Sequence, residues 1–461
     1  MILKGKLGEA EFREESLNGN LLRLVVSLGI PLAFYYLFNG LFGLLDTIMA
    51  SHIGSLEVSS ISYLSQLQNL MTSLGAGLIS GAMISVNQAY GKGDDEGVRR
   101  SMNNLFTLLS VIIVLLLLMI PFVPVLLKLL RTPEEFISVG TSYFRVLLLS
   151  SALNLVNTLY INVEKTRGRT ERVMLLNIVV LVIKLSLTAV FVYVLDGGVV
   201  LIACATLLSY LFLFVFAVIR FSDRKSLFSL VPSFMKLRRN ETGKIMHLSV
   251  PLMVERSAFS FGKTVTNTMV ASISALSVGA LGISMSISGL LTNMQSGFSD
   301  ASVAVISQND GAGRKDRVVK AYFAVLLVTV TVSSLGTVIL YFLSSPLIHL
   351  FAVSRYGYDE SFELLIRNVF RFDLFSCIPL AFNTAATSLI LGTGRTKLTF
   401  LVAFCRVFAF RIPVLYFLMN CTTLGSDAVG VMMIVSNGST ALLSTSIALG
   451  IILKEKRKNN G

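Results

Sequence analysis

Charged residues are scarce in this 461-residue sequence: Asp, Glu, Lys and Arg together make up 14% of it, whereas 54% is hydrophobic. Soluble globular proteins carry roughly 25% charged residues, so the deficit excludes an ordinary soluble domain. Residues 104–127 contain no charge, and residues 173–195 contain one. Because about 20 apolar residues cross the hydrocarbon core as a helix, these runs predict a helical membrane protein. They lack the short alternating segments of a membrane β-barrel.

Residue types that build catalytic and metal sites are equally sparse. The three histidines are scattered and the four cysteines lack paired spacing, which argues against a metal site or a disulfide framework. No Walker loop is present, which argues against ATP as the driving force. The acidic cluster 94–96 would suit an enzyme that binds a diphosphate through Mg²⁺, but the matching stretch 314–317 is mainly basic. We therefore expect no enzyme, no catalytic residues and no cofactor.

The apolar runs predict twelve membrane-spanning helices. Residues 1–20 are rich in charge and the first apolar run is too long for a cleaved signal, so we expect a retained first helix. The predicted spans are 24–50, 58–89, 102–127, 137–162, 173–195, 199–220, 246–273, 279–307, 318–343, 362–391, 398–419 and 428–453.

The net charge of +13 follows from where the basic residues lie. Lys and Arg concentrate in the tails and in the loops after even-numbered spans. The loops after odd-numbered spans contain only Lys128, Arg131 and Arg355. The positive-inside rule then places both termini in the cytoplasm, in a multi-pass protein of the plasma (inner) membrane. We expect contact with membrane lipid and no binding of nucleic acid.

The sequence contains an internal repeat. At an offset of 220 residues, Pro31 matches Pro251, Gly77 matches Gly297, and the stretch 86–93 matches 306–313. At an offset of 226, the stretches 144–145 and 168–170 match 370–371 and 394–396. Six spans per half is an even number, so both halves enter the membrane in the same direction, with a solute path expected between them. We predict an N-terminal bundle over 1–221, a cytoplasmic linker over 222–245 and a C-terminal bundle over 246–461.

Several segments resemble the multidrug and toxin extrusion (MATE) family. They are LDTIMA at 45–50, QAYGKGD at 88–94, QNDGAG at 308–313, GTGRT at 392–396 and RIP at 411–413. The resemblance covers nearly the whole chain. It implies an all-α membrane protein with twelve helices in two six-helix bundles, related by pseudo-twofold symmetry about the membrane normal. It also implies export of a small-molecule substrate, often an organic cation, in exchange for Na⁺ or H⁺. We expect a monomer.

The first span contains a candidate cation-coupling site. Asn39, Gly43 and Asp46 recur at the spacing of one helix face, and a carboxylate beside an amide can hold Na⁺ or a proton by turns. The resemblance carries a cation-coupling aspartate onto Asp46, where Na⁺ would be the only metal expected. The alternative is an acid that reaches the outer membrane interface near His52.

Further ionisable residues lie within predicted spans. Inserting each one into the membrane costs a free energy of roughly 3 kcal/mol, so each requires a partner or a function. Lys184 interrupts 173–195, and an ion pair with Asp46 is one interpretation. Glu255, Lys263 and Asn267 recur along one span and either face the cleft or find partners elsewhere.

Four more charged residues belong to the second half. We expect Asp300 and Asp373 to lie nearer the cytoplasmic side and to pair at the membrane interface. Arg406 and Arg411, five residues apart, should lie on different helix faces. Arg411 nearly matches Lys184 in the repeat.

Cationic residues in both halves leave a second function open. Lys184, Lys263 and Arg411 would suit a solute with anionic groups. A flippase or exporter of a lipid-linked substrate with an anionic head group is therefore the alternative to multidrug antiport.

Overall fold

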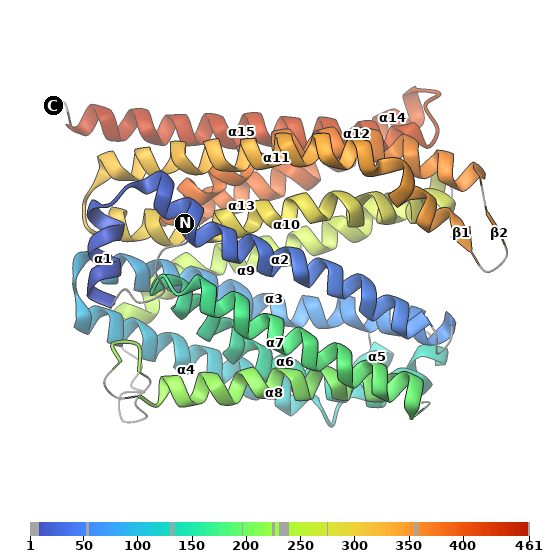
Figure 1. Cartoon of the computed structure of the whole chain (residues 1–461), viewed down its shortest axis with the longest axis horizontal. Helices are drawn as coiled ribbons and strands as arrows, with labels where there is room; N and C mark the ends of the chain where they lie inside the picture. The colour runs from blue at the N-terminus through green and yellow to red at the C-terminus, as the bar shows by residue number, and fades with distance from the viewer. Residues whose placement is uncertain are drawn as a thin grey trace. The chain divides into compact units, whose positions relative to one another are not determined.

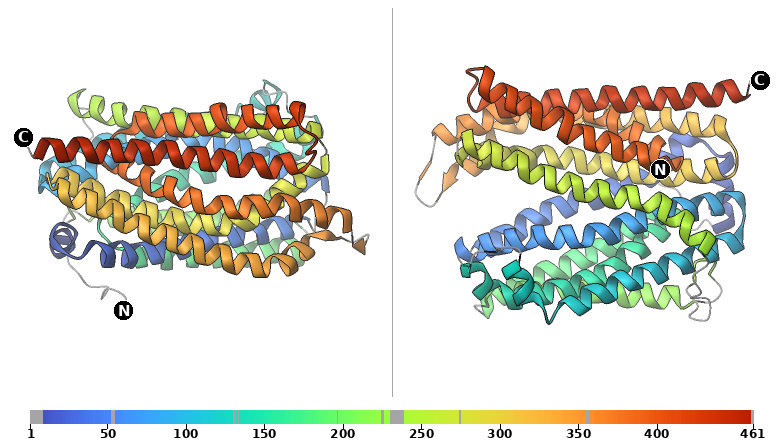
Figure 2. Two further views of the ribbon diagram at one scale, coloured as in Figure 1. Left: turned by 90° about the horizontal axis from the view of Figure 1, so that it is seen from above. Right: turned by 180° about the vertical axis from the view of Figure 1, so that it is seen from behind.

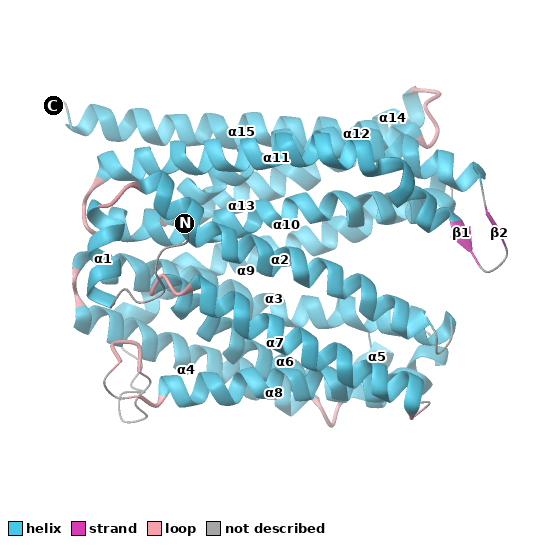
Figure 3. Cartoon of the chain, viewed as in Figure 1, coloured by secondary structure: helices cyan, strands magenta, loops and turns pink. Residues whose placement is uncertain are grey.

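Almost the entire described chain is helical in the computed structural model (Figures 1 and 3), which describes residues 9–51, 55–129, 132, 134–195, 197–223, 226–229, 239–273, 275–354, 357–358 and 360–459. The helices of the first half are α1 (Glu9–Asn18), α2 (Leu21–Ser51), α3 (Ser55–Lys92), α4 (Asp95–Met119), α5 (Val123–Leu129), α6 (Glu134–Thr166), α7 (Thr170–Ala189), the π-helix η1 (Val190–Val194) and α8 (Val199–Phe221).

The second half repeats this plan. Its helices are α9 (Arg239–Ile273), α10 (Ala275–Gly311), α11 (Lys315–Ala352), α12 (Glu360–Gly392), α13 (Thr396–Phe404), the π-helix η3 (Cys405–Arg411), α14 (Ile412–Cys421) and α15 (Asp427–Asn459). Two short antiparallel strands, β1 (Val353–Ser354) and β2 (Gly357–Tyr358), lie between α11 and α12 with Val353 opposite Tyr358.

The helices confirm the predicted all-α membrane fold. Among the described residues, eleven helices are long and apolar enough to cross a membrane. The long helix α9 is less apolar than these and contains Glu255, Arg256 and Lys263. The predicted span 102–127 is divided into α4 and α5, because a proline inside a helix lacks the N–H for the helical hydrogen bond and Pro121 lies at the break.

Four repeated glycines end helices in the same way. Gly93, Gly168, Gly313 and Gly394 all have φ near +75°, between 74° and 76°. After α10, the Gly313 N–H donates to the Asp310 carbonyl at 3.1 Å and the next N–H donates to the Asn309 carbonyl at 2.9 Å. This is the Schellman pattern, which favours glycine because its left-handed residue is strained by a side chain. These four glycines of the repeat are therefore helix-ending residues.

The chain forms two compact units. Among the described residues, one contains 14–40 and 255–459, and the other contains 9–13 and 41–254. The first long helix of each half, α2 and α9, thus contributes residues to both units. The predicted boundaries 1–221, 222–245 and 246–461 follow the sequence repeat and stay a prediction.

Equivalent glycines allow close helix crossings in the two units. In one unit, a Cβ at Gly77 on α3 would lie 2.7 Å from the Met253 Cα on α9. In the other unit, a Cβ at Gly297 on α10 would lie 2.3 Å from the Ala33 backbone nitrogen on α2. The two glycines, and likewise the two residues they meet, are related by the offset of 220 residues. The crossing is therefore reciprocal: each half's second long helix packs on the first helix of the other half.

Helix α12 is central to the unit that contains the C-terminus, where it packs against α10, α11 and α15. Figure 2 shows these helices running alongside one another. Their apolar residues form a continuous core that includes Leu291, Phe370, Leu374 and Met432. In the other unit, α6 packs against α3 and α8.

Candidate functional site

A cavity of about 120 Å³ lies within the C-terminal unit, among charged residues from three different helical segments. Lys263 comes from α9, Asp373 from α12, and Arg406 and Arg411 from η3. Helix α12 begins at Glu360, so at about 1.5 Å per residue Asp373 lies roughly 20 Å along a helix of roughly 50 Å. The carboxylate therefore enters the cavity from the body of α12, away from the helix ends.

The π-helix η3 brings two arginines into one cavity. In an α-helix, residues five apart are separated by roughly 140° around the axis. A π-helix closes its hydrogen bonds between residues i and i+5, so Arg411 follows Arg406 on the same side. The expectation that they lie on different faces is therefore wrong, because it assumed regular α-helical geometry. Such π segments occur frequently at functional sites.

Asp373 is surrounded by hydroxyl groups. The residue is 2% exposed, and its Oδ2 accepts hydrogen bonds from Ser284 at 2.8 Å and Ser288 at 2.7 Å. Ser376 adds a longer contact of 3.4 Å to Oδ1. A buried carboxyl group requires such partners in place of water. The expected pairing of Asp373 at the membrane interface is wrong, because α10 supplies two serines one turn apart.

A chain of hydrogen bonds links this carboxylate to an arginine. Arg406 Nη2 donates to Asn437 Oδ1 at 2.9 Å, and Asn437 Nδ2 donates to Ser376 Oγ at 2.8 Å. The Arg406 guanidinium also lies 5.6 Å from the centre of the Phe259 ring, a cation–π distance. Arg406 is thus fixed by contacts from α9 and α15.

Arg411 has fewer contacts. It is 2% exposed, yet within the described part of the chain no group accepts a hydrogen bond from its Nε or Nη2. No described ion pair joins Arg411 to Asp373. Lys263 is exposed on α9 and lies at the border of the cavity. The cavity therefore combines three cationic side chains with one carboxylate.

The structure brings together only part of the predicted site. Lys263 and Arg411 line the cavity, whereas Asn267 is exposed on α9 and Glu255 is half-buried there; neither lines it. Asn39 on α2 donates to the Tyr35 carbonyl at 2.9 Å, within its own helix.

The remaining predicted residues are Asp46, Lys184 and Asp300. The side chain of Asp46 lies outside the described residues, so its pairing with Lys184 stays a prediction. Lys184 is half-buried on α7. Asp300 on α10 accepts a hydrogen bond of 2.5 Å from Tyr36 on α2, within one unit. This contact lies between two helices, whereas we expected pairing at the membrane interface.

Sequence reasoning missed Ser284, Ser288 and Asn437. The two serines are four residues apart, a spacing that places them on one helix face. That spacing is a usable signal for a polar stripe. It does not show that the stripe faces Asp373, because the partner depends on which helices meet.

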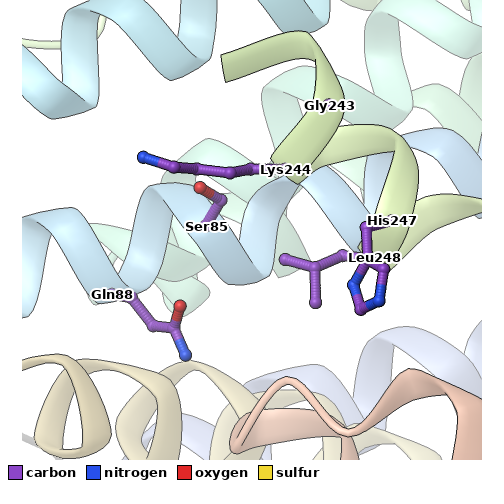
Figure 4. Close-up of a pocket in the computed structure, with 6 residues that line it drawn as sticks. All are labelled: Ser85, Gln88, Gly243, Lys244, His247 and Leu248. Carbon is purple, nitrogen blue, oxygen red and sulfur yellow. The ribbon is translucent and has the colours of Figure 1, made fainter. Parts of the chain in front are cut away.

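A second, open cavity of about 440 Å³ lies in the other unit between α3 and α9 (Figure 4). Ser85 and Gln88 line it from α3, while Lys244 and His247 line it from α9. Lys244 already pairs with Glu241 at 3.5 Å. This cavity is more open and is lined by fewer charged side chains than the cavity around Asp373, so the cavity around Asp373 is the stronger candidate site.

Comparison with known proteins supports the predicted family. The MatE family model matches residues 31–190 and 251–417. Protein DETOXIFICATION 38 of Arabidopsis thaliana is 26% identical over 63% of this chain, and the match spans 58% of that protein. A probable multidrug resistance protein NorM of Thermotoga maritima is 22% identical over 87% of this chain and 86% of its own length.

Solved structures show the same fold. An outward-facing multidrug resistance MATE family transporter of the MOP superfamily matches with a TM-score of 0.89 at 19% identity, over 96% of this chain and 98% of that one. A MOP superfamily transporter from Pyrococcus furiosus, described as having a binding pocket of reverse polarity, matches with a TM-score of 0.88 at 20% identity, over 96% and 98%. The family model covers both halves of the repeat, and the chain therefore belongs to the MatE family of membrane transporters.

Proposed function

We propose that this protein is a secondary active exporter that expels organic compounds in exchange for Na⁺ or H⁺ by alternating access. The main support is the charged cavity in a membrane-spanning unit, because ionisable groups at membrane depth mark substrate or ion pathways. The duplicated fold supports the same proposal, since transporters built from repeats bind their solute near the bilayer midplane. The relatives named as multidrug resistance proteins suggest the substrate range. We further propose no enzymatic activity, a monomer, and an inner-membrane location with cytoplasmic termini.

Asp46 remains the proposed coupling residue, together with Asn39. Asp373 is a further carboxylate of interest and is buried, but Arg406 and Arg411 line the same cavity. Like charges repel across a low-dielectric site, so Na⁺ beside Asp373 is disfavoured. The first half lacks this arginine pair in the positions offset by 226 residues, which are Val180 and Leu185.

Transport in proteoliposomes under separate Na⁺ and proton gradients tests this proposal. The native protein should accumulate or expel a fluorescent organic solute under one gradient and not the other. Asp46→Asn should abolish that gradient dependence, whereas Asp223→Asn, which changes an exposed acid, should retain it. Gradient-independent behaviour of the native protein would contradict antiport. Full coupling in Asp46→Asn would remove Asp46 as the coupling residue.

A flippase or exporter of a lipid-linked or otherwise anionic substrate is the second candidate. The excess of cationic side chains over carboxylates in the cavity favours it. Expression in a drug-sensitive host separates the two candidates. Resistance to organic cations that disappears in Asp46→Asn supports multidrug antiport. A cell-envelope defect without a change in drug resistance supports the flippase.

A further inference from the structure

We infer that the cavity lined by Lys263, Asp373, Arg406 and Arg411 is a binding site for one anionic oxygen group, a phosphate or a carboxylate, of the transported compound. That this compound is transported rests on the proposed exporter function. The binding of an anionic group rests on the cavity alone, so the two can be tested separately.

The charges that line the cavity do not cancel. Among the described residues that line it, three are cationic and one is a carboxylate, which leaves a formal excess of two positive charges. Arg406 and Arg411 belong to a helix that crosses the apolar region, where an uncompensated charge is costly. An anionic ligand would reduce that cost, whereas an organic cation would increase it.

The free donors have the geometry that an oxyanion requires. The Nε–H of a guanidinium and one of its Nη groups form a planar fork that pairs with two oxygens of a carboxylate or phosphate. In Arg411, Nε and Nη2 are the atoms without an acceptor among the described residues. The structure describes no hydrogen bond or ion pair between Arg411 and Asp373, whose Oδ2 accepts from Ser284 and Ser288.

The size and lining of the cavity limit what enters. A volume of about 120 Å³ is well below the roughly 300–1,000 Å³ of pockets that enclose a drug-sized ligand. That space suits a single small anionic group. Phe259, Met285 and Met433 supply apolar contacts beside it. Lys263 is exposed, so the remainder of a larger molecule would extend past its side chain.

A tryptophan reporter makes binding measurable without transport. The native sequence contains no tryptophan, so Phe259→Trp introduces a single tryptophan that keeps an aromatic ring against Arg406. The purified full-length protein is titrated with phenyl phosphate, and with phenol and phenyltrimethylammonium as neutral and cationic counterparts. We expect saturable binding of phenyl phosphate and none of the other two at the same concentrations. Preferential binding of the cation would overturn the inference.

Charge-removing variants locate the site. Arg411→Gln should weaken phenyl phosphate binding roughly tenfold to hundredfold, since a hydrogen bond to a charged group is lost. Lys263→Gln should weaken it roughly severalfold, and its exposed position keeps the test valid if Arg411→Gln does not fold. Lys397→Gln, at an exposed lysine outside the cavity, is the matched control. Unchanged affinity in both Lys263→Gln and Arg411→Gln would refute the site.

The lipid environment distinguishes two sources of the anionic group. Weaker phenyl phosphate binding in phosphatidylglycerol nanodiscs than in phosphatidylcholine nanodiscs indicates competition by a lipid head group. Equal binding in both indicates a soluble organic anion, and either result retains the anion site. Binding without gradient-driven transport would remove the exporter proposal and leave this inference intact. Coupled transport without phenyl phosphate binding would remove this inference and leave the exporter proposal intact.

Discussion

The direction in which Asp373→Asn changes ligand affinity is the most direct test of whether the C-terminal cavity binds an anion. Asp373→Asn keeps the shape of the side chain and retains an oxygen that can accept from Ser284 or Ser288. It removes the only carboxylate among the described residues that line the cavity. An anion bound at Arg411 should therefore bind more tightly in this variant.

The size of the increase follows from Coulomb's law. With an anion roughly 6 Å from the Asp373 carboxylate and an effective dielectric constant of about 20, the repulsion is roughly 3 kcal/mol. Relaxation and trapped water reduce this figure, so we expect a gain of about 1–3 kcal/mol, or roughly fivefold to 150-fold in affinity.

Titration of the Phe259→Trp reporter with phenyl phosphate measures this change directly. Asp300→Asn is the matched control, because Asp300 is a carboxylate of the same unit that bonds Tyr36 and does not line the cavity. Its affinity should equal that of the parent. A lower affinity in Asp373→Asn, with an intact fold, would mean that the carboxylate attracts the ligand and would refute the anion site.

Two further predictions concern stability, measured as thermal unfolding in detergent. Gly297→Ala should destabilise the protein by roughly 1–3 kcal/mol, because its Cβ would lie 2.3 Å from the Ala33 backbone nitrogen. Gly289→Ala on the same helix is the control: its Cβ would meet open space, so its effect on stability should be near neutral. Equal effects of the two would contradict the close crossing. Glu164→Gln should cost roughly 3–5 kcal/mol, because Glu164 is fully buried and paired with Arg167 at 2.9 Å. Glu96→Gln, at an exposed pair, should cost about 1 kcal/mol or less, and a similar loss in both variants would contradict this account.

Hydropathy and repeated glycines predicted much of the fold. The lengths of the apolar runs define the long helices, because the bilayer thickness sets that length. The matched glycines mark helix ends for a local reason, since a left-handed residue at a helix end favours glycine. Both signals are contained in short stretches of sequence.

The site was harder to predict because it depends on contacts between distant segments. Lys263 and Arg411 were recognised from their charge within apolar spans. The environment of Asp373 depends on serines from another helix, 85 and 89 residues away in sequence. The π-helix that brings Arg406 beside Arg411 departs from the regular period that sequence reasoning assumes.

The reciprocal helix crossing bears on the origin of the chain. Gly77 packs on Met253 and Gly297 packs on Ala33, so each half supplies the first helix that the other half's second helix requires. Two identical six-helix chains could satisfy these contacts mutually by exchanging their first helices, as in a domain-swapped dimer. Fusion of two such copies would then fix the exchange within one polypeptide. A separated half, lacking its exchanged helix, would expose this glycine face until it met a second copy.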